Sequence, residues 1–565
     1  MKEYYPDMIT SQRNFSFVDY PLANVGANNS GGFPMLELNL SNSPLSKFQF
    51  SVGYSFASTL TGKMENTDPS RQLSSRNNLR FGGKWASGPV RVSVDAGGIL
   101  WTKVSRFTMG QTQYRDNYFD RVPWDWYRNS FLRYEEYYTL STNIGAEGFG
   151  RSPLLGYVAN VDILPLQMRL MGVYGRTNLS ATVANSVNGF PSEVYAGRVE
   201  KTIFTRRIAG KVGFNYYMKN AQTDISRGIP DQNDMYTVDY NLKIYKILFS
   251  GEAGIGHINN PALKDRGAGF AFKTELDRSV TSFPIALEYY RIGVNMASID
   301  GSILNSNTTI RAGGYATEFV YDASMNLNIM QEVGQIANNR HGFSLTGEKN
   351  IWRFKIQFGY AISQELKHIS DTITMQHRVN AFSRSRFRPW FQASGPYGRI
   401  KGFWLRTFET ITTDSNTTGL KGFNAFDLLL KYKCKFLNKD LVILNFINYN
   451  SVQVGFKPIP EMSDKAFVRL FYEDITLAYR LGKKYNIVFN AGVETMKGND
   501  KTNLSPENGK PIDQFGYAYG GAIDYDFAPN AGIHFRHKWM SHKDKNFTLD
   551  RFKGQESYIE LKIFF

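Results

Sequence analysis

Lysine and arginine recur at every second position of apolar segments, and this spacing decides what chemistry they could do. Arg353 and Lys355, for example, alternate with Trp352, Phe354 and Ile356. Successive side chains of an extended chain point to opposite faces, so such cations gather on one face and the apolar residues on the other. Fixed positive charge along a narrow passage attracts anions. The candidates for an anion path are Arg169, Lys211, Lys243, Arg353, Lys355 and Lys431.

The overall charge agrees with an anion path, but the same cations could have a purely structural role. The chain has 66 Lys and Arg against 50 Asp and Glu, which gives a formal net charge of +16. The alternative is that the cations pair across strands with acidic residues such as Asp239 and Glu252, or are simply solvated. Both interpretations remain open at this point.

Two segments combine aromatic rings with guanidinium groups, a pairing that suits sugar rings, anionic glycans or peptides. Rings stack on such ligands, and arginine forms bidentate hydrogen bonds with their anionic groups. We predict both segments to be loops, within residues 114–138 and 384–404. The alternative is that their aromatic residues form a small core or an aromatic girdle. The candidates for ligand binding are Trp124, Trp126, Tyr127, Arg128, Arg388 and Trp390.

The sequence has no recognisable catalytic or metal-binding motif, so we expect no enzyme, metal site or other cofactor. The seven histidines show no HExxH-like spacing, and there is no glycine-rich phosphate loop. His534 and His537 near Ser541 could be assembled into a hydrolytic site, but any large protein offers such combinations. The single Cys434 excludes an internal disulfide.

The candidate residues must be positioned by β-strands, because a two-residue period runs through the whole chain. Residues 48–56 and 352–362 alternate apolar and polar side chains strictly. Segments of about ten residues with this alternation are typical of transmembrane strands when they recur. Further examples are residues 90–100, 166–174, 208–218, 236–244, 247–255, 426–436, 485–493, 517–525 and 531–539.

Composition favours a membrane protein built of strands over one built of helices. Aromatic residues make up 15% of the chain, an excess that girdles at the two membrane surfaces would explain. The mean hydropathy of -0.36 and the lack of any run of about 18 apolar residues argue against transmembrane helices. A barrel interleaves apolar residues with polar ones that face its lumen, so low hydropathy is expected of it.

The chain ends in an alternating segment in which Ile559, Leu561, Ile563 and Phe565 share one face. This ending, together with the repeated strand pattern, resembles Gram-negative outer-membrane β-barrels over essentially the whole chain, and the composition is similar to that of Bacteroidota barrels. The resemblance implies a location in the outer membrane, Phe565 as an assembly signal, and the barrel-assembly machinery as a partner. It also implies contact with outer-membrane lipid and lipopolysaccharide, and no role in nucleic acid binding.

We therefore predict an all-β fold, a single large antiparallel up-and-down transmembrane β-barrel. At roughly 20 to 25 residues for each strand with its connection, the chain holds about 22 to 26 strands, and no fewer than about 18. Residues 1–32 are expected to form a polar arm, and residues 33–565 the barrel with its long extracellular loops. Short connections such as 245–246 alternate with long ones such as 102–153, which predicts a C terminus on the periplasmic side. Because the first seven residues lack the apolar core of a signal peptide, we expect the numbering to describe a mature or trimmed chain.

Two main hypotheses about function follow. The first is a porin-like channel for hydrophilic solutes, anions among them. The second is the barrel subunit of a larger outer-membrane complex for secretion, surface attachment or nutrient uptake, with its pore plugged by loops or by a protein partner. A wide barrel without an obstruction leaks, which favours inward loops or a partner. A surface adhesin with a closed pore is a third class.

Overall fold

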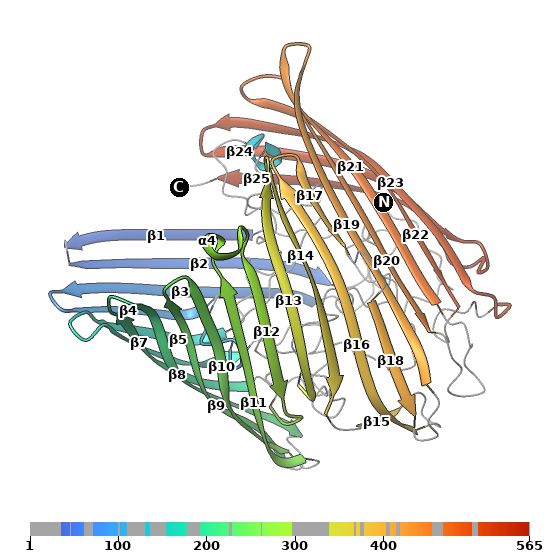
Figure 1. Ribbon diagram of the computed structural model, residues 1–565. Coiled ribbons are helices and arrows are strands. Elements are labelled where there is room, and N and C mark those ends of the chain that lie inside the picture. Colours follow the sequence, from blue (N-terminus) through green and yellow to red (C-terminus); the bar gives the residue numbers. More distant parts are fainter. Residues whose placement is uncertain are drawn as a thin grey trace.

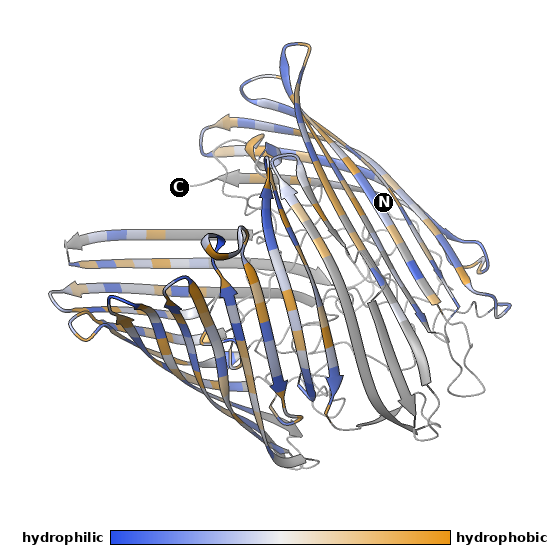
Figure 2. Cartoon of the chain, in the orientation of Figure 1, coloured by the Kyte–Doolittle hydropathy of each residue, from blue (hydrophilic) through white to orange (hydrophobic). Residues whose placement is uncertain are grey.

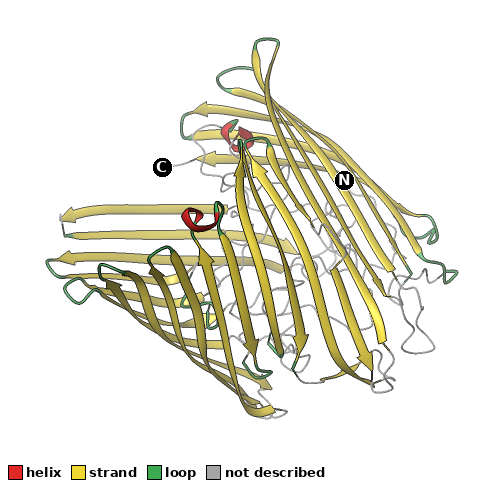
Figure 3. Ribbon diagram, viewed as in Figure 1, coloured by secondary structure: helices red, strands yellow, loops and turns green. Residues whose placement is uncertain are grey.

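The part of the chain that the structure describes consists mostly of β-strands (Figure 3). The computed structural model describes residues 35–45, 47–61, 72–99, 102–109, 130–135, 154–177, 192–224, 229–260, 263–296, 338–366, 369–372, 378–402, 407–413, 418–454, 467–499, 505 and 507–563. The predicted arm, residues 1–32, lies outside these ranges, as does Phe565.

The strands form one strongly curved sheet (Figure 1). Its first part contains β1 (Met35–Leu45), β2 (Phe48–Thr61), β3 (Gln72–Ser87), β4 (Val90–Ile99), β5 (Leu154–Ile163), β6 (Met168–Thr177), β7 (Ser192–Phe204), β8 (Ile208–Asp224) and β9 (Ile229–Ile244). The middle part contains β10 (Ile247–Asn260), β11 (Leu263–Leu276), β12 (Ile285–Ile292), β13 (Arg340–Ile351), β14 (Phe354–Glu365), β15 (Ile369–Thr372), β16 (Arg378–Gly395), β17 (Gly398–Gly402) and β18 (Thr407–Thr413). The last part contains β19 (Thr418–Phe436), β20 (Lys439–Val454), β21 (Phe467–Arg480), β22 (Tyr485–Gly498), β23 (Ile512–Ala528), β24 (Ala531–Asp544) and β25 (Arg551–Ile563).

Every ladder between described strands is antiparallel, and the strands pair in chain order. β14 and β15 pair with successive stretches of β16 and are one interrupted strand. β17 and β18 are likewise one interrupted strand between β16 and β19. When each interrupted strand is counted once, the 25 described strands make 23 passes from one end of the sheet to the other, which we call crossings. The predicted all-β, antiparallel up-and-down architecture and the predicted strand number are confirmed.

The two edges of this sheet are β1 and β25. Within the described ranges each of them pairs with a single neighbour, β2 and β24 respectively. Because the number of crossings is odd, the two edge strands run in the same direction, as their arrows in Figure 1 indicate.

Tight turns join the strands at one end of the sheet, which we call the short-turn end. Tyr245–Lys246 joins β9 to β10, and Leu437–Asn438 joins β19 to β20 with both residues at positive φ, 49° and 61°. Two such residues match the twist of antiparallel strands. The turn before β14 lies at Trp352–Arg353, and Trp352 takes a left-handed φ of 54° there. The opposite end, from which β4 leaves, is the long-loop end.

Helix is confined to two single turns among the described residues. α1 (Leu132–Glu135) lies within the long connection between β4 and β5. α4 (Arg278–Thr281) lies between β11 and β12 and is capped by Asp277, whose side chain accepts a hydrogen bond from the Ser279 amide at 2.9 Å. In this part of the chain no helix is long and apolar enough to cross a membrane.

The faces of the sheet are reversed relative to those of a soluble protein. On β22 and β23 the outward residues Phe489 and Ile523 are each 52% exposed, whereas the inward Asn490 and Asp524 are 2% and 0% exposed. Figure 2 shows the corresponding alternation of hydropathy along the strands. Aromatic side chains pair on the outward face. Tyr485, for example, stacks on Tyr525 with the ring centroids 4.6 Å apart. An apolar face turned outward and a polar face turned inward is the architecture of the outer-membrane type of β-barrel.

Candidate functional site

The inner face of the sheet carries two segments of the connection between β4 and β5. Residues 102–109 lie on the inner face of β5–β12, and we call this contact the first dock. Residues 130–135 lie on the inner face of β19–β24, and we call this contact the second dock. The chemistry of the site is that of these two docks and of the polar residues around them.

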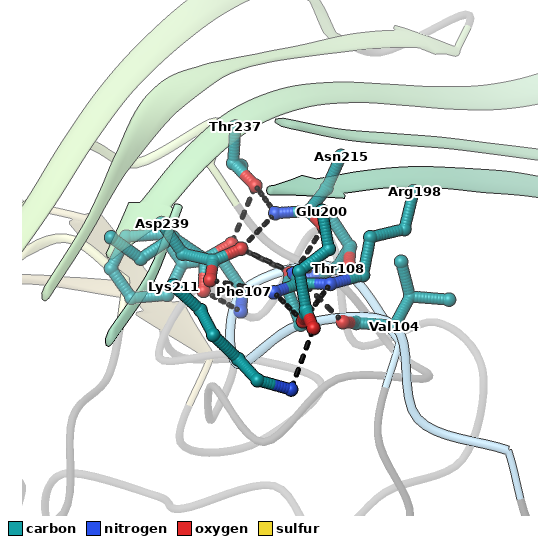
Figure 4. Close-up of polar contacts among 11 residues, drawn as sticks. Val104, Phe107, Thr108, Arg198, Glu200, Lys211, Asn215, Thr237 and Asp239 are labelled. Carbon is teal, nitrogen blue, oxygen red and sulfur yellow. Dashed lines mark hydrogen bonds and ion pairs between the residues drawn. The ribbon is translucent and has the colours of Figure 1, made fainter. Parts of the chain in front are cut away.

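Glu252 of β10 is the polar centre of the first dock. Figure 4 shows its partner Thr237 together with Asn215 and Asp239. It is 3% exposed. One carboxylate oxygen accepts hydrogen bonds from the hydroxyls of Ser105, at 2.6 Å, and Thr237, at 2.5 Å. The other accepts one from the backbone amide of Phe107 at 3.0 Å. A buried carboxylate needs such donors, because removing it from water is costly.

Arg198 of β7 joins the docked segment to a second polar group of the first dock. Its guanidinium donates to the carbonyl of Val104 at 3.3 Å and to Asn215 Oδ1 at 2.6 Å. It also forms ion pairs with Asp239 and, at 3.0 Å, with Glu200. A Cβ at Gly213 would lie 2.6 Å from the Arg198 Cζ, so the glycine leaves the space in which the guanidinium sits.

Apolar packing completes the first dock. Phe107 is 0% exposed, and Val104 and Met109 are also buried. They pack against inward apolar residues of the wall, which are Val158, Val173, Val194, Ala196, Tyr217, Met235, Ala271, Tyr290 and Ile292, together with Met296 beyond β12. These wall residues stand at positions where the strand pattern otherwise places polar side chains, so the patch exists only because the segment covers it.

The second dock is held by two aspartates near the end of β23. Asp526 accepts hydrogen bonds from the backbone amide and the hydroxyl of Ser130, at 3.1 and 2.9 Å. Asp524 accepts one from the hydroxyl of Tyr134 at 3.2 Å and lies 2.9 Å from His534 Nδ1. A further contact is an ion pair between Lys433 of β19 and Glu135.

The apolar part of the second dock is smaller than that of the first. Phe131 and Tyr134 are 1% and 3% exposed. Arg480 lies over the Phe131 ring, 5.7 Å from its centroid. The wall residues beneath them are Leu429, Val442, Leu444, Ala478, Val488 and Ala522, all buried at inward positions.

The two docks lie on facing parts of the wall. Counted around the sheet, β9 and β22 are separated by about half of the crossings, and Figure 1 draws them on opposite sides. The second dock lies beside the short turn that follows β23. The connection itself leaves β4 and enters β5 at the long-loop end. Residues 130–135 are therefore bound to the part of the sheet that faces β4 and β5, near the short-turn end. The connection to which they belong joins β4 and β5 at the long-loop end.

Three of the six predicted anion-path cations form ion pairs. Arg169 forms an ion pair with Asp162 at 2.6 Å, Lys211 one with Glu200 at 2.7 Å, and Lys355 one with Glu348 at 2.7 Å. Lys431 donates to the backbone carbonyl of Glu135 in the second dock. Lys243 is exposed near the short-turn end of β9.

Three other predicted residues lie elsewhere than expected. Arg353 is in the turn before β14, where it donates to the Tyr397 hydroxyl at 3.4 Å and lies over the Trp352 ring. Arg388 and Trp390 are in strand β16 and pair with Ala361 and Gly359 of β14, so the prediction of a loop there is wrong. The reason is the two-residue spacing of Arg384, Arg386 and Arg388, which is a strand pattern. Trp124, Trp126, Tyr127 and Arg128 lie outside the described residues.

Sequence reasoning missed both docks, although a signal for the second was present. Leu428, Leu429 and Leu430 are consecutive, as are Leu441, Val442, Ile443 and Leu444. Such runs place apolar side chains on both faces of a strand, so an inward cover was required. Neither run of apolar residues predicts which segment of the chain packs against the inner face.

Outside the wall, Glu507 joins two connections at the long-loop end. Its carboxylate accepts hydrogen bonds from the Thr548 amide at 3.1 Å, the Thr548 hydroxyl at 2.8 Å and the Leu549 amide at 3.2 Å. These hydrogen bonds lower the pKa of Glu507. No group of His, Cys, Asp and Glu suited to a metal ion occurs among the described residues.

Comparisons with known proteins give two solved structures of interest. A chain described as a bacterial polysaccharide outer membrane secretin has a TM-score of 0.22 and 9% identity, and the match covers 67% of this chain and 92% of that one. The P pilus usher (PapC) translocation pore has a TM-score of 0.33 and 8% identity, with 95% and 96% covered. Scores this low do not establish a common fold. No family model and no curated protein matches the sequence.

Proposed function

We propose that this chain forms a pore through the outer membrane whose lumen holds a segment of the same chain. The observation that carries the proposal is the reversed sheet, since exposed apolar residues such as Phe489 and Ile523 alternate with buried polar ones such as Asn490 and Asp524. Only a wall with lipid outside and polar contents inside favours this arrangement.

The role that we favour is the barrel subunit of a larger outer-membrane complex, for secretion, surface attachment or nutrient uptake. The two docks support it, because residues 102–109 and 130–135 lie against the inner wall and occupy space that an open porin leaves free. The paired state of Arg169, Lys211 and Lys355 also supports it, since paired cations exert a weaker field on passing anions.

A porin-like channel for hydrophilic solutes is the second candidate. It is favoured by the net charge of +16 and by Lys243, which is exposed on the inward side of β9. In either role the short-turn end and the C terminus would face the periplasm, because outer-membrane barrels have short periplasmic turns.

Conductance of the purified chain in a planar lipid bilayer tests the pore. We expect a folded protein that conducts rarely by itself and that co-purifies with protein partners after mild detergent extraction. Large and steady conductance from the lone chain would favour the porin. A folded protein that never conducts, with or without its partners, would contradict both candidates.

A further inference from the structure

The two edges of the sheet, β1 and β25, carry backbone groups that need partners, and we call these two edges together the seam. Within the described ranges β1 pairs only with β2, and β25 only with β24. An edge strand presents a row of amide and carbonyl groups that its one neighbour does not bind. Hydrocarbon offers such groups no hydrogen bonds, so an open edge is not stable inside a membrane. The proposed pore therefore requires that something close the seam.

The direction of the two edges limits what can close the seam. β1 and β25 both run toward the short-turn end, where Leu45 precedes the turn to β2 and Ile563 lies opposite Ala531. Joined directly, they would form a parallel ladder, whereas every described ladder is antiparallel. One additional strand that runs the opposite way would pair antiparallel with both edges. It would also make the number of crossings even, as is usual in bacterial outer-membrane barrels.

A second copy of this chain cannot supply that strand. Two copies inserted into one membrane have the same orientation, so the edges of both copies run toward the same membrane surface. Every pairing between copies would again be parallel. Residues 1–32 are also unsuited, because no stretch of about ten residues among them carries apolar side chains at every second position, as a lipid-facing strand requires.

The outward side chains of the edges indicate which sequence pattern the additional strand needs. Ile559 and Leu561 of β25 are 73% and 60% exposed, and Leu40 of β1 is 68% exposed. On β24 the residues opposite the first two, Phe535 and Ile533, are only 39% and 42% exposed, because strands flank them on both sides. The difference is lateral apolar surface that a further strand would cover.

We propose that the seam receives a β-strand of a protein partner, which runs antiparallel to β1 and β25 and completes the wall. This inference rests on the proposed pore and specifies how the barrel subunit joins its complex. Backbone hydrogen bonds to the two edges provide the affinity. Apolar side chains at every second position, beside Leu40, Ile559 and Leu561, match the outward face, and polar side chains between them face the lumen.

Site-directed crosslinking at both edges is the first test. The photoreactive residue p-benzoylphenylalanine replaces Leu36, Leu40, Ser557 or Leu561, one in each variant of the full-length chain, in the outer membrane of cells that contain its partners. We expect all four variants to crosslink to one segment of one other polypeptide. Leu40 and Leu561 lie nearer the short-turn end than Leu36 and Ser557, so they should link to earlier residues of that segment.

The matched control is the same replacement at Phe489 of β22, which is exposed on the outward face but lies away from the seam. It should not link to the segment. Links to different polypeptides from the two edges, links in the reverse order, links to residues of this chain, or no links at all would each overturn the partner strand.

Disulfide formation across the seam is the second test. In a Cys434→Ser background, one cysteine at Leu36, Leu38 or Leu40 is combined with one at Ser557, Ile559 or Leu561. An inserted strand keeps every such pair about 10 Å apart, or two strand spacings, which is beyond the reach of a disulfide. We therefore expect none in the complex, whereas Phe535→Cys with Ile559→Cys, which lie directly opposite each other, should form one. A disulfide in any pair across the seam would show that β1 and β25 meet directly.

The outcomes separate the seam from the pore. If β1 and β25 form a disulfide and the chain conducts in a planar bilayer, the pore stands and the partner strand fails. If the folded protein never conducts, with or without its partners, the pore fails, and the partner strand loses its basis with it.

Discussion

The first and second docks solve one problem, the attachment of a loop to the inside of a barrel, with different interactions. The first uses a network in which Glu252 and Arg198 are satisfied by the docked backbone and by the wall. The second uses two aromatic side chains on an apolar patch, with aspartates and a half-exposed lysine beside it. A satisfied buried network is costly to break because each group left behind loses its partner. Release of the second dock would remove the Ser130 donors from Asp526 and the Tyr134 hydroxyl from Asp524, although His534 would remain 2.9 Å from Asp524.

The strongest test of this difference is Glu252→Ala. It would leave the Ser105 hydroxyl, the Thr237 hydroxyl and the Phe107 amide without their acceptor. We expect a loss of about 3 kcal/mol or more in the free energy of unfolding, from buried donors left unpaired. The measurement is the temperature at which the folded form is lost on a gel. A loss no greater than that of Asp526→Ala would contradict the view that the buried network around Glu252 holds its segment more firmly than the aspartates of the second dock.

Gly213→Ala is expected to have the next largest effect. The new Cβ would lie 2.6 Å from the Arg198 Cζ, and the guanidinium is held by four acceptors and cannot easily retreat. We expect destabilisation by about 1 to 3 kcal/mol, typical of overpacking. Gly172→Ala is the matched control, because nothing lies within 4 Å of a Cβ at that position. Equal unfolding temperatures of the two variants would show that Arg198 has room to move.

At the second dock, Glu135→Gln should produce a smaller and salt-dependent change. It removes the ion pair with Lys433, and exposed pairs are worth up to about 1 kcal/mol. The free energy of unfolding should therefore fall by no more than about 1 kcal/mol at low salt, measured from the temperature at which the folded form is lost on a gel. The difference from the wild type should vanish near 1 M salt, where charges are screened within about 3 Å. A loss that persists at high salt would mean that Glu135 contributes more than its charge.

The smallest expected effect lies outside both docks, at Glu507. The pKa of Glu507 in the folded protein is below its ordinary value of 4.5. The hydrogen bonds of its carboxylate therefore stabilise the contact between the two connections at pH values above 4.5. This stabilisation is lost as the pH falls through the lower pKa of the folded protein. Limited proteolysis within residues 507–510 should accelerate at acid pH in the wild type. Glu507→Gln should cleave at the same rate across that pH range. Acid-dependent opening of either dock in Glu507→Gln would show that the docks have titrating groups of their own.

The wall could be predicted from sequence because each strand carries its own two-residue pattern. Residues 247–255 and 485–493 were assigned from that pattern, and the strands there are β10 and β22. Strand β16 was missed because its alternating arginines were interpreted as loop chemistry. The docks are of another kind, since Ser105 meets Glu252 across 147 positions and Ser130 meets Asp526 across 396. No local pattern encodes such a pairing. The apolar runs at Leu428–Leu430 and Leu441–Leu444 indicated only that something covers the inner face.

The chain order of the strands has a consequence for how the molecule folds. Each ladder joins strands that follow one another, so the wall is made of contacts that are local in sequence, whereas the docks join distant positions. Local contacts require little loop closure and form early, and distant ones form late. Hairpins can thus accumulate into a wall while the connection between β4 and β5 is still undocked. Formation of the wall and docking of residues 102–109 and 130–135 are then separate kinetic events, and a newly formed wall passes through an undocked state.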